Sequence, residues 1–219
     1  MKTLFAMGII GTLFMSVFLV LILRLRNRNV NYIQIPRRLM LLGGFLFFMI
    51  TGFVPRYLTG DEPHYLIIAQ SIVTDLDLDL TDEYAEVPHL APHYAAVDRG
   101  RHSVHSIGLG ILLALPWAIA GERGAILMMN CLATLLVLAF DRLLEACNIV
   151  SYSRLVAMIS FATCLPTLSF ASQIYPEIPA ALCITLVLSE LLRSVNQPCK
   201  YWIVIMGISI LPWLHVRFV

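Results

Sequence analysis

The sequence predicts an all-α fold: a polytopic bundle of transmembrane helices with one long extracytoplasmic loop that carries an amphipathic surface helix. Hydrophobic residues make up 59% of the 219-residue chain and charged residues only 13%, whereas water-soluble domains carry about 25% charged residues. Apolar runs long enough to span a bilayer recur along the chain. Nine of the fourteen acidic residues lie between about Leu58 and Ser103, so the polar chemistry is concentrated in one loop.

Composition also excludes some classes of function. The net charge of +1 and the absence of a clustered basic face argue against a nucleic-acid partner. The five cysteines are scattered through or beside apolar runs, without the paired spacing of a zinc site. We interpret them as small buried hydrophobic residues.

The N-terminal region, residues 1–38, is predicted to be a transmembrane helix followed by a basic cytoplasmic loop. Leu4–Leu23 is uncharged over twenty residues, enough to cross a hydrocarbon core of about 30 Å at about 1.5 Å per residue. It is longer than the apolar core of a signal peptide, while a short hairpin or a peripheral helix remains an alternative. The positive-inside rule places the loop in the cytoplasm, because it contains five arginines and no acidic residue: Arg24, Arg26, Arg28, Arg37 and Arg38.

The second region, residues 39–219, begins with the run Leu39–Val54, which we expect to cross outward and to end at Pro55. The loop 58–103 then lies outside the cytoplasm. Within it, Asp61–Thr74 is predicted to be an amphipathic helix, because apolar residues recur at i, i+3, i+4 and i+7 behind a capping Asp61.

The rest of the loop is predicted to be non-helical. Asp75–Leu80 alternates strictly between aspartate and leucine, as in a short strand or an extended rim. Asp75, Asp77 and Asp79 resemble a calcium-type acidic run, but the intervening leucines do not fit an EF-hand, which favours a solvated edge. Val87–Gly100 contains two prolines and a glycine and is interpreted as irregular loop.

Further apolar runs follow: Ser106–Gly121, Gly124–Phe140, Leu155–Ile174, Ile178–Leu192 and a last one from Tyr201 to Leu214. Counting every run as a crossing puts the turn at Gly121 inside, Asp141–Arg154 outside and Tyr175–Glu177 inside. Arg142 and Arg154 favour the opposite side for their connection. If one short run were re-entrant, Glu177 would instead share a side with the acidic loop, and the sequence leaves both topologies open. An apolar run that continues almost to Val219 suggests a fragment or a truncated relative of a longer protein.

Adjacent Asp61 and Glu62, with His64 close by, suit two kinds of chemistry at a membrane exit. A carboxylate can act as general base on an acceptor hydroxyl. A carboxylate with histidine can instead hold a divalent cation that neutralises a phosphate. The alternative is a solvated helix cap.

Five other polar residues stand at the edges of apolar runs. His102 and His105 precede the re-entry into the membrane and suit either phosphate binding or an interfacial position. Glu177 either lines a cavity or lies in the first turn of a helix at the interface. His215 and Arg217 interrupt the last apolar run, where they either meet an anionic lipid phosphate or mark the end of the span.

The block Gly60-Asp61-Glu62-Pro63-His64-Tyr65, opening a long external loop, resembles the first loop of GT-C fold membrane glycosyltransferases. The likeness is to family 39, the dolichyl-phosphate-mannose–protein mannosyltransferases, and to bacterial mannosyltransferase-like and arabinosyltransferase-like proteins. It covers the chain from about Leu39 to the end. Weaker similar blocks lie at Gly100–Gly108, Tyr175–Ala181 and Pro212–Arg217.

The resemblance implies a membrane glycosyltransferase that moves a sugar from a polyprenyl-phosphate donor to an extracytoplasmic acceptor. Asp61 would be the base or a metal partner, with a divalent cation such as Mg or Mn, and Glu62 its catalytic neighbour. Substrate-binding candidates are His64, Tyr65, His102, His105, Glu177, His215 and Arg217.

The expected setting is the plasma membrane of a prokaryote. Family members usually contain more spans than this chain, and Leu4–Leu23 precedes the expected first helix. The chain is therefore expected to be a fragment of an active enzyme or an inactive remnant. The alternative function is a non-enzymatic assembly subunit or a transporter fragment that keeps the helical fold.

Overall fold

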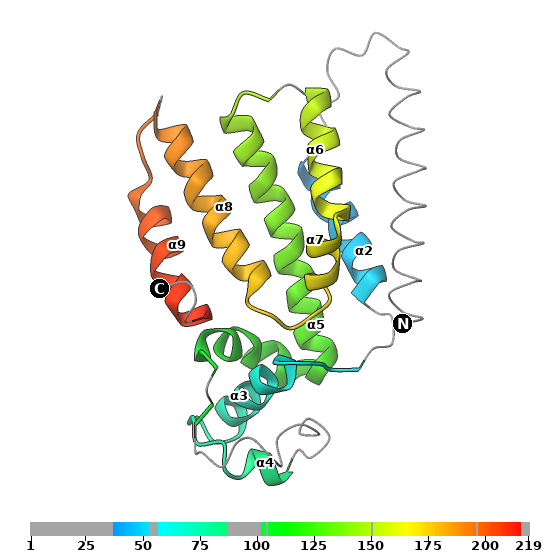
Figure 1. The fold of residues 1–219 in the computed structure, drawn as a ribbon, viewed down its shortest axis with the longest axis vertical. Coiled ribbons are helices and arrows are strands. Elements are labelled where there is room, and N and C mark those ends of the chain that lie inside the picture. The colour runs from blue at the N-terminus through cyan, green and yellow to red at the C-terminus, as the bar shows by residue number, and fades with distance from the viewer. Residues whose placement is uncertain are drawn as a thin grey trace.

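The computed structural model describes residues 37–52, 57–86, 102–103, 105–149, 151–195 and 197–215. These residues form helices and connecting segments with no β-strand, which confirms the predicted all-α class. The helices are α2 (Arg37–Gly52), α3 (Glu62–Thr74), α4 (Glu83–Glu86), α5 (Ile107–Ala146), α6 (Ser151–Thr163), α7 (Leu165–Phe170), α8 (Glu177–Ser194) and α9 (Tyr201–Leu214). Figure 1 shows most of them running along a bundle, with α3 and α4 gathered at one end.

Helices α2, α8 and α9 follow the predicted apolar runs closely. The predicted span Leu4–Leu23, the first three arginines of the basic loop and the predicted loop Val87–Gly100 lie outside the described residues.

Helix α5 joins two apolar runs that the sequence separates. Its 40 residues continue through Glu122 and Arg123, but Ala120 and Gly121 leave helical geometry, and Gly121 adopts φ 56° and ψ −140°. A left-handed φ of this kind is available to glycine without a steric penalty. The result is one helix with a sharp turn and two arms.

The first arm of α5 lies across the end of the bundle beside α3, and the second arm runs along the bundle (Figure 1). Two contacts fix the first arm: Gly110 lies against Ile68, and Trp117 Nε1 donates a hydrogen bond to Gln70 Oε1 at 2.6 Å. The turn at Gly121 therefore stays at the same end of the molecule as α3. The runs Ser106–Gly121 and Gly124–Phe140 therefore belong to one bent helix, whose first arm lies across the end of the bundle and whose second arm runs along it.

The predicted span Leu155–Ile174 is not one continuous helix, because the chain breaks into α6 and α7. Cys164 between them is extended, with φ −63° and ψ 148°. Pro166 follows at the start of α7, and a proline cannot donate the backbone hydrogen bond that would continue α6. After α7, the segment Ala171–Pro176 reaches the same end as α3 and leads into α8.

Helix α3 confirms the predicted helix, but it is not an amphipathic surface helix. Five consecutive residues, Tyr65 to Ala69, are at most 1% exposed. The apolar side chains that break the amphipathic pattern, Leu66 and Ile67, are covered by neighbouring protein. The expected capping by the Asp61 side chain is also absent, since that side chain makes no cap hydrogen bond.

The acidic segment after α3 forms turns and bends rather than a strand. Leu76 has φ 61° and is 86% exposed, while Leu80 is buried. The alternating leucines therefore do not share one face. Neither the short strand nor the extended rim predicted for Asp75–Leu80 is observed, because the segment starts as a turn at Asp75 and bends at Leu76 and Asp77.

One helix among the described residues, α5, is long and apolar enough to cross a membrane by length and composition. Leu39–Ile50 in α2 and Tyr201–Leu214 in α9 are shorter apolar helices. The core is built mainly from α3, both arms of α5 and the start of α8.

The turn of α5 requires glycine at position 124. A Cβ there would lie 2.0 Å from the carbonyl oxygen of Pro116 in the first arm. We expect Gly124→Ala to lower the free energy of unfolding by about 1–3 kcal/mol, because the backbone must shift. Thermal unfolding of the detergent-solubilised chain measures the effect. Gly43→Ala in α2, where a Cβ meets nothing within 4 Å, is the matched control and should be neutral or stabilising by up to about 1 kcal/mol. Equal melting temperatures for the two variants would contradict the close approach.

Candidate functional site

The residues at the start of α3 are held by the carboxylate of Glu62, which is fully buried. Its Oε2 accepts a hydrogen bond from the backbone N–H of Thr59 at 3.0 Å. Its Oε1 accepts one from the backbone N–H of Ile174 at 2.8 Å. Glu62 thus joins two segments that are 112 residues apart in the chain.

Tyr175 provides a second connection between the same segments. Its hydroxyl donates a hydrogen bond to the carbonyl oxygen of Thr59 at 3.0 Å. Burial, with the negative charges of Glu62 and Asp61 nearby, raises the pKa of Tyr175, so its hydroxyl keeps its proton and remains a donor. Gly60 makes room for this contact: it has φ 59°, and a Cβ there would lie 2.4 Å from the Tyr175 hydroxyl oxygen.

These two connections leave the neighbouring Asp61 carboxylate facing outward. Its side chain is 47% exposed and its Oδ2 lies 3.9 Å from Nδ1 of His105, whose side chain is 13% exposed. Asp61 therefore combines a backbone fixed by Glu62 with a carboxylate that solvent or a ligand can reach.

The His105 ring is held by aromatic neighbours from α3. Its centroid lies 4.2 Å from that of His64 and 5.4 Å from that of Tyr65, the latter in an edge-to-face arrangement. The backbone N–H of His105 also donates to Ser103 Oγ at 3.1 Å. These contacts pack the His105 ring against α3 beside Asp61.

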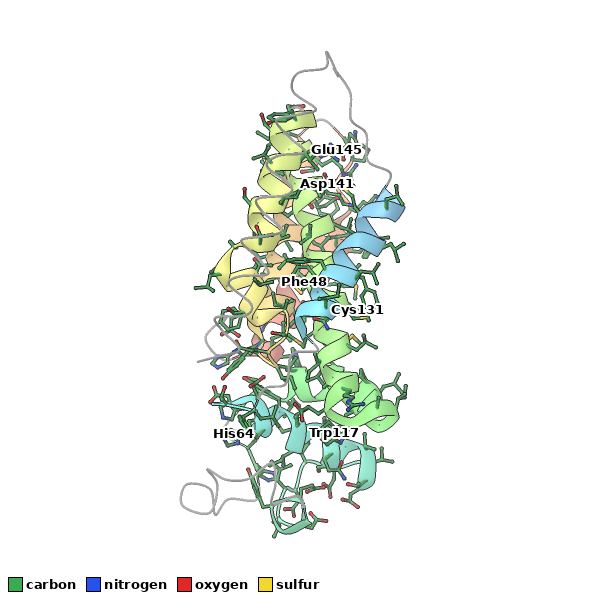
Figure 2. All side chains as sticks on the ribbon, turned by 90° about the vertical axis from the view of Figure 1, so that its right-hand side faces the viewer. Phe48, His64, Trp117, Cys131, Asp141 and Glu145 are labelled. Carbon is green, nitrogen blue, oxygen red and sulfur yellow. The ribbon has the colours of Figure 1, made fainter. Side chains whose placement is uncertain are left out.

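The structure therefore brings together five of the predicted site residues: Asp61, Glu62, His64, Tyr65 and His105. Figure 2 shows His64 and Trp117 toward the α3 end, with Asp141 and Glu145 at the opposite end of the bundle.

The other predicted residues lie around this group or beyond it. His102 is exposed, and its Nδ1 lies 3.0 Å from the carbonyl oxygen of Leu78 in the acidic segment. Glu177 begins α8, two residues after Tyr175, and its Oε2 is buried without a hydrogen-bond partner among the described residues. His215 ends α9 in an extended conformation. Arg217 lies outside the described residues.

The end of α9 nevertheless reaches the site. A Cβ on Gly108 would lie 2.3 Å from the carbonyl oxygen of Trp213, so the last turn of α9 packs directly against the first turn of α5. His215 and His105 thus occupy segments that meet at the α3 end of the bundle.

The predicted Mg or Mn site at Asp61 has few ligands. Asp61 and His105 supply one carboxylate oxygen and one imidazole nitrogen, and the one group of three candidate ligands among the described residues lies elsewhere, at Asp75, Asp82 and Glu83. Magnesium in proteins is usually held by one or two carboxylates together with water and substrate phosphates. A Mg or Mn site at Asp61 therefore stays a prediction.

A polar cavity of about 500 Å³ lies at the opposite end of the bundle. It contains none of the predicted site residues; its charged lining residues are Arg142, Glu145, Glu190, Arg193 and Lys200.

Comparison with family models, with curated proteins and with solved structures finds no match to this chain.

Two contributors to the site were not predicted as site residues: the Ile174 backbone N–H and the Tyr175 hydroxyl. Neither carries a sequence signal for this role, because each acts on Thr59 or Glu62 more than 110 residues away. In the sequence, Tyr175 is part of the family-like block Tyr175–Ala181, which assigns it no role of its own.

The geometry separates the roles of the two adjacent carboxylates. We expect Glu62→Gln to lower the free energy of unfolding by about 1–3 kcal/mol, because the amide replaces one buried acceptor with a donor that faces another N–H. For a chain of this size that corresponds to a melting temperature about 2–12 °C lower. Asp61→Asn is the matched control at the exposed neighbour and should change stability by less than about 0.5 kcal/mol. The assignment fails if the two variants melt alike.

Proposed function

We propose that this chain carries the catalytic region of a GT-C-type membrane glycosyltransferase, which transfers a sugar from a polyprenyl-phosphate donor to an acceptor hydroxyl outside the cytoplasm. The observation that carries the proposal is the accessible Asp61 carboxylate, which lies 3.9 Å from Nδ1 of the packed His105. The adjacent Glu62 is buried and hydrogen-bonded to the Ile174 N–H, so it holds the backbone at Asp61 in place. A general base must be accessible to substrate and held in one place. Asp61 meets both requirements.

In the proposed reaction Asp61 accepts the proton of the acceptor hydroxyl as the hydroxyl oxygen attacks the anomeric carbon of the donor. The new carbon–oxygen bond forms as the bond from the anomeric carbon to the phosphate oxygen breaks, and its electron pair leaves with the polyprenyl phosphate. His105 Nδ1 lies 3.9 Å from the Asp61 carboxylate and lines the same site. Glu62 acts as a positioning residue, since both its oxygens accept backbone hydrogen bonds.

The proposed membrane setting is supported by the surface of the bundle. Soluble monomers rarely expose large contiguous apolar patches, yet α9 exposes a series of large apolar side chains by 40–71%: Tyr201, Trp202, Ile205, Met206, Ile208, Ile210 and Trp213. A polyprenyl-phosphate donor needs such a setting, because its lipid tail lies in the bilayer.

The distribution of charge supports an orientation. Basic residues occur where α5 ends, α6 begins and α8 ends, at the end of the bundle opposite α3: Arg142, Arg154, Arg193 and Lys200. The α3 end contains the acidic segment, which has no lysine or arginine between Tyr57 and Glu86, and the α5 turn at that end adds Arg123 beside Glu122. Under the positive-inside rule the basic end faces the cytoplasm and Asp61 faces outward.

The catalytic assignment is tested by sugar transfer in membranes that contain the full chain. Labelled polyprenyl-phosphate mannose and polyprenyl-phosphate arabinose are supplied in separate arms, and incorporation into lipid and protein fractions is measured. We expect Asp61→Asn to reduce transfer by about 10²–10⁴-fold, the usual contribution of a general base. Asp79→Asn is the control for the loss of one negative charge in the same loop and should retain activity. Transfer by Asp61→Asn at the wild-type rate would exclude Asp61 as the base, and no transfer from either donor would favour the non-enzymatic alternative.

The orientation is tested by thiol labelling in intact cells. None of the native cysteines lies between Tyr57 and Glu86, so Leu76→Cys at the 86% exposed position in the acidic segment introduces a unique thiol there. We expect a membrane-impermeant maleimide to label Leu76→Cys in intact cells. The native Cys147, exposed after α5 at the basic end, should be labelled only after permeabilisation. The reverse pattern would place Asp61 in the cytoplasm.

A further inference from the structure

The polar cavity at the basic end of the bundle lies where three helices begin or end. Helix α5 ends at Ala146, α8 ends at Ser194 and α9 begins at Tyr201, and all three contribute residues to the lining. The cavity has a volume of about 500 Å³, within the range of about 300–1,000 Å³ that is usual for small-molecule sites. Its lining contains three cations and two acids: Arg142, Arg193, Lys200, Glu145 and Glu190.

The charge of Glu190 is compensated within the protein. Its side chain is 6% exposed, and Arg193 donates to both carboxylate oxygens, from Nε to Oε2 at 3.1 Å and from Nη2 to Oε1 at 2.6 Å. The backbone N–H of Lys200 also donates to Oε1. Arg193 Nη2 donates in addition to the carbonyl oxygen of Pro198 at 3.2 Å. Arg193 therefore neutralises Glu190 and holds the connection between α8 and α9.

Two of the lining cations have no such partner. The other lining acid, Glu145, is 52% exposed, and its Oε2 lies 3.5 Å from Nη2 of Arg154, which is not part of the lining. The side chains of Arg142 and Lys200 form neither a hydrogen bond nor an ion pair with any residue that the structure describes. Both side chains are exposed, so Arg142 and Lys200 are the positive charges that a ligand in the cavity can reach.

The helix dipoles do not account for these two cations. A helix C-terminus attracts cations within its last turn, but α5 has no basic residue in its last turn, and Arg142 lies before it. Lys200 is the N-cap residue of α9, and the N-terminus of a helix favours negative rather than positive charge. An anion between Arg142 and Lys200 would compensate both side chains and the start of α9.

The residues around the cavity indicate that the anion belongs to a lipid. Tyr201 and Trp202 follow Lys200 directly and are 71% and 63% exposed, and exposed tyrosine and tryptophan are typical of the membrane–water interface. Leu192 lines the cavity and is 43% exposed, and Leu188 on the same helix is 45% exposed. The polar cavity therefore adjoins an apolar surface of α8, along which acyl chains can lie.

We propose that this cavity binds the phosphodiester headgroup of an anionic membrane lipid, with Arg142 and Lys200 contacting the phosphate and the acyl chains lying against α8. Basic pockets between membrane helices on the cytoplasmic side bind anionic headgroups in this way. The inference rests on the membrane setting and orientation proposed above, but not on sugar transfer at Asp61. The lipid comes from the cytoplasmic leaflet, at the opposite end of the bundle from Asp61, so it is distinct from the proposed donor.

The test is native mass spectrometry of the purified, detergent-solubilised full chain, titrated with phosphatidylglycerol. We expect one saturable lipid, bound at least about tenfold more tightly than phosphatidylcholine, because the choline cation cancels the phosphate charge that Arg142 and Lys200 recognise. Glycerol 3-phosphate is the arm for a free phosphate. It should bind at least about tenfold more weakly than phosphatidylglycerol, because it has no acyl chains to place against α8.

Three variants change the cavity and one serves as a matched control. Arg142→Gln and Lys200→Gln should each weaken phosphatidylglycerol binding by about fivefold, the usual contribution of one basic residue to an anionic lipid. Ser189→Phe places a ring in the lining without changing charge and should weaken binding by at least about fivefold through steric exclusion. Arg123→Gln removes one exposed positive charge at the α3 end and should change binding by less than about twofold.

The proposal is overturned by equal binding of phosphatidylcholine or glycerol 3-phosphate, by wild-type binding in the cavity variants, or by an equally large loss in Arg123→Gln. If Ser189→Phe does not fold, the variants at the exposed Arg142 and Lys200 decide alone, because substitutions of exposed side chains rarely affect stability. Asp61→Asn should bind phosphatidylglycerol like the wild type. The outcome is therefore independent of whether Asp61 catalyses sugar transfer.

Discussion

The buried carboxylate of Glu62 is the interaction on which the candidate site depends. It accepts one backbone hydrogen bond from its own turn and one from Ile174, so it connects the start of α3 to the segment that enters α8. A buried charge is tolerated only when it is compensated by hydrogen bonds or opposite charge, and both oxygens receive backbone hydrogen bonds here. The preceding residue, Asp61, faces solvent and His105. The buried Glu62 holds the two segments together, and the exposed Asp61 carboxylate is accessible to a substrate.

The sharp turn in α5 decides which segments meet. Its first arm covers α3, and its second arm extends along the bundle to the opposite end (Figure 1). With that turn at the α3 end, the segment after α7 and the end of α9 also reach the α3 end. Three regions distant in sequence thereby surround Asp61. A straight α5 would carry the Tyr175 segment to the other end and leave Glu62 without its partner.

The two ends of the bundle differ in the way they handle charge. At the basic end the acids are paired with arginine: Asp141 accepts two hydrogen bonds from Arg154, at 2.5 and 2.7 Å, and Glu190 accepts two from Arg193, at 3.1 and 2.6 Å. At the α3 end the described hydrogen-bond partners of Glu62 are backbone N–H groups, and the described ion-pair neighbour of Asp61 is His105.

The sequence by itself determined the all-α class, the positions of α2, α3, α8 and α9, and the grouping of Asp61 with His64 and Tyr65, because hydrophobic content and short-range spacing are local properties. It also placed His105 among the candidates. The tertiary structure alone decided that α5 turns at Gly121, that α3 is buried, that the span from Leu155 breaks at Cys164, and that Glu62 binds the Ile174 segment. These features depend on which surfaces pack together, and a hydrogen bond across 112 residues leaves no periodic signal. The Asp61-Glu62 pair can therefore be recognised from the sequence, but only the tertiary structure shows that Glu62 is buried and Asp61 is exposed.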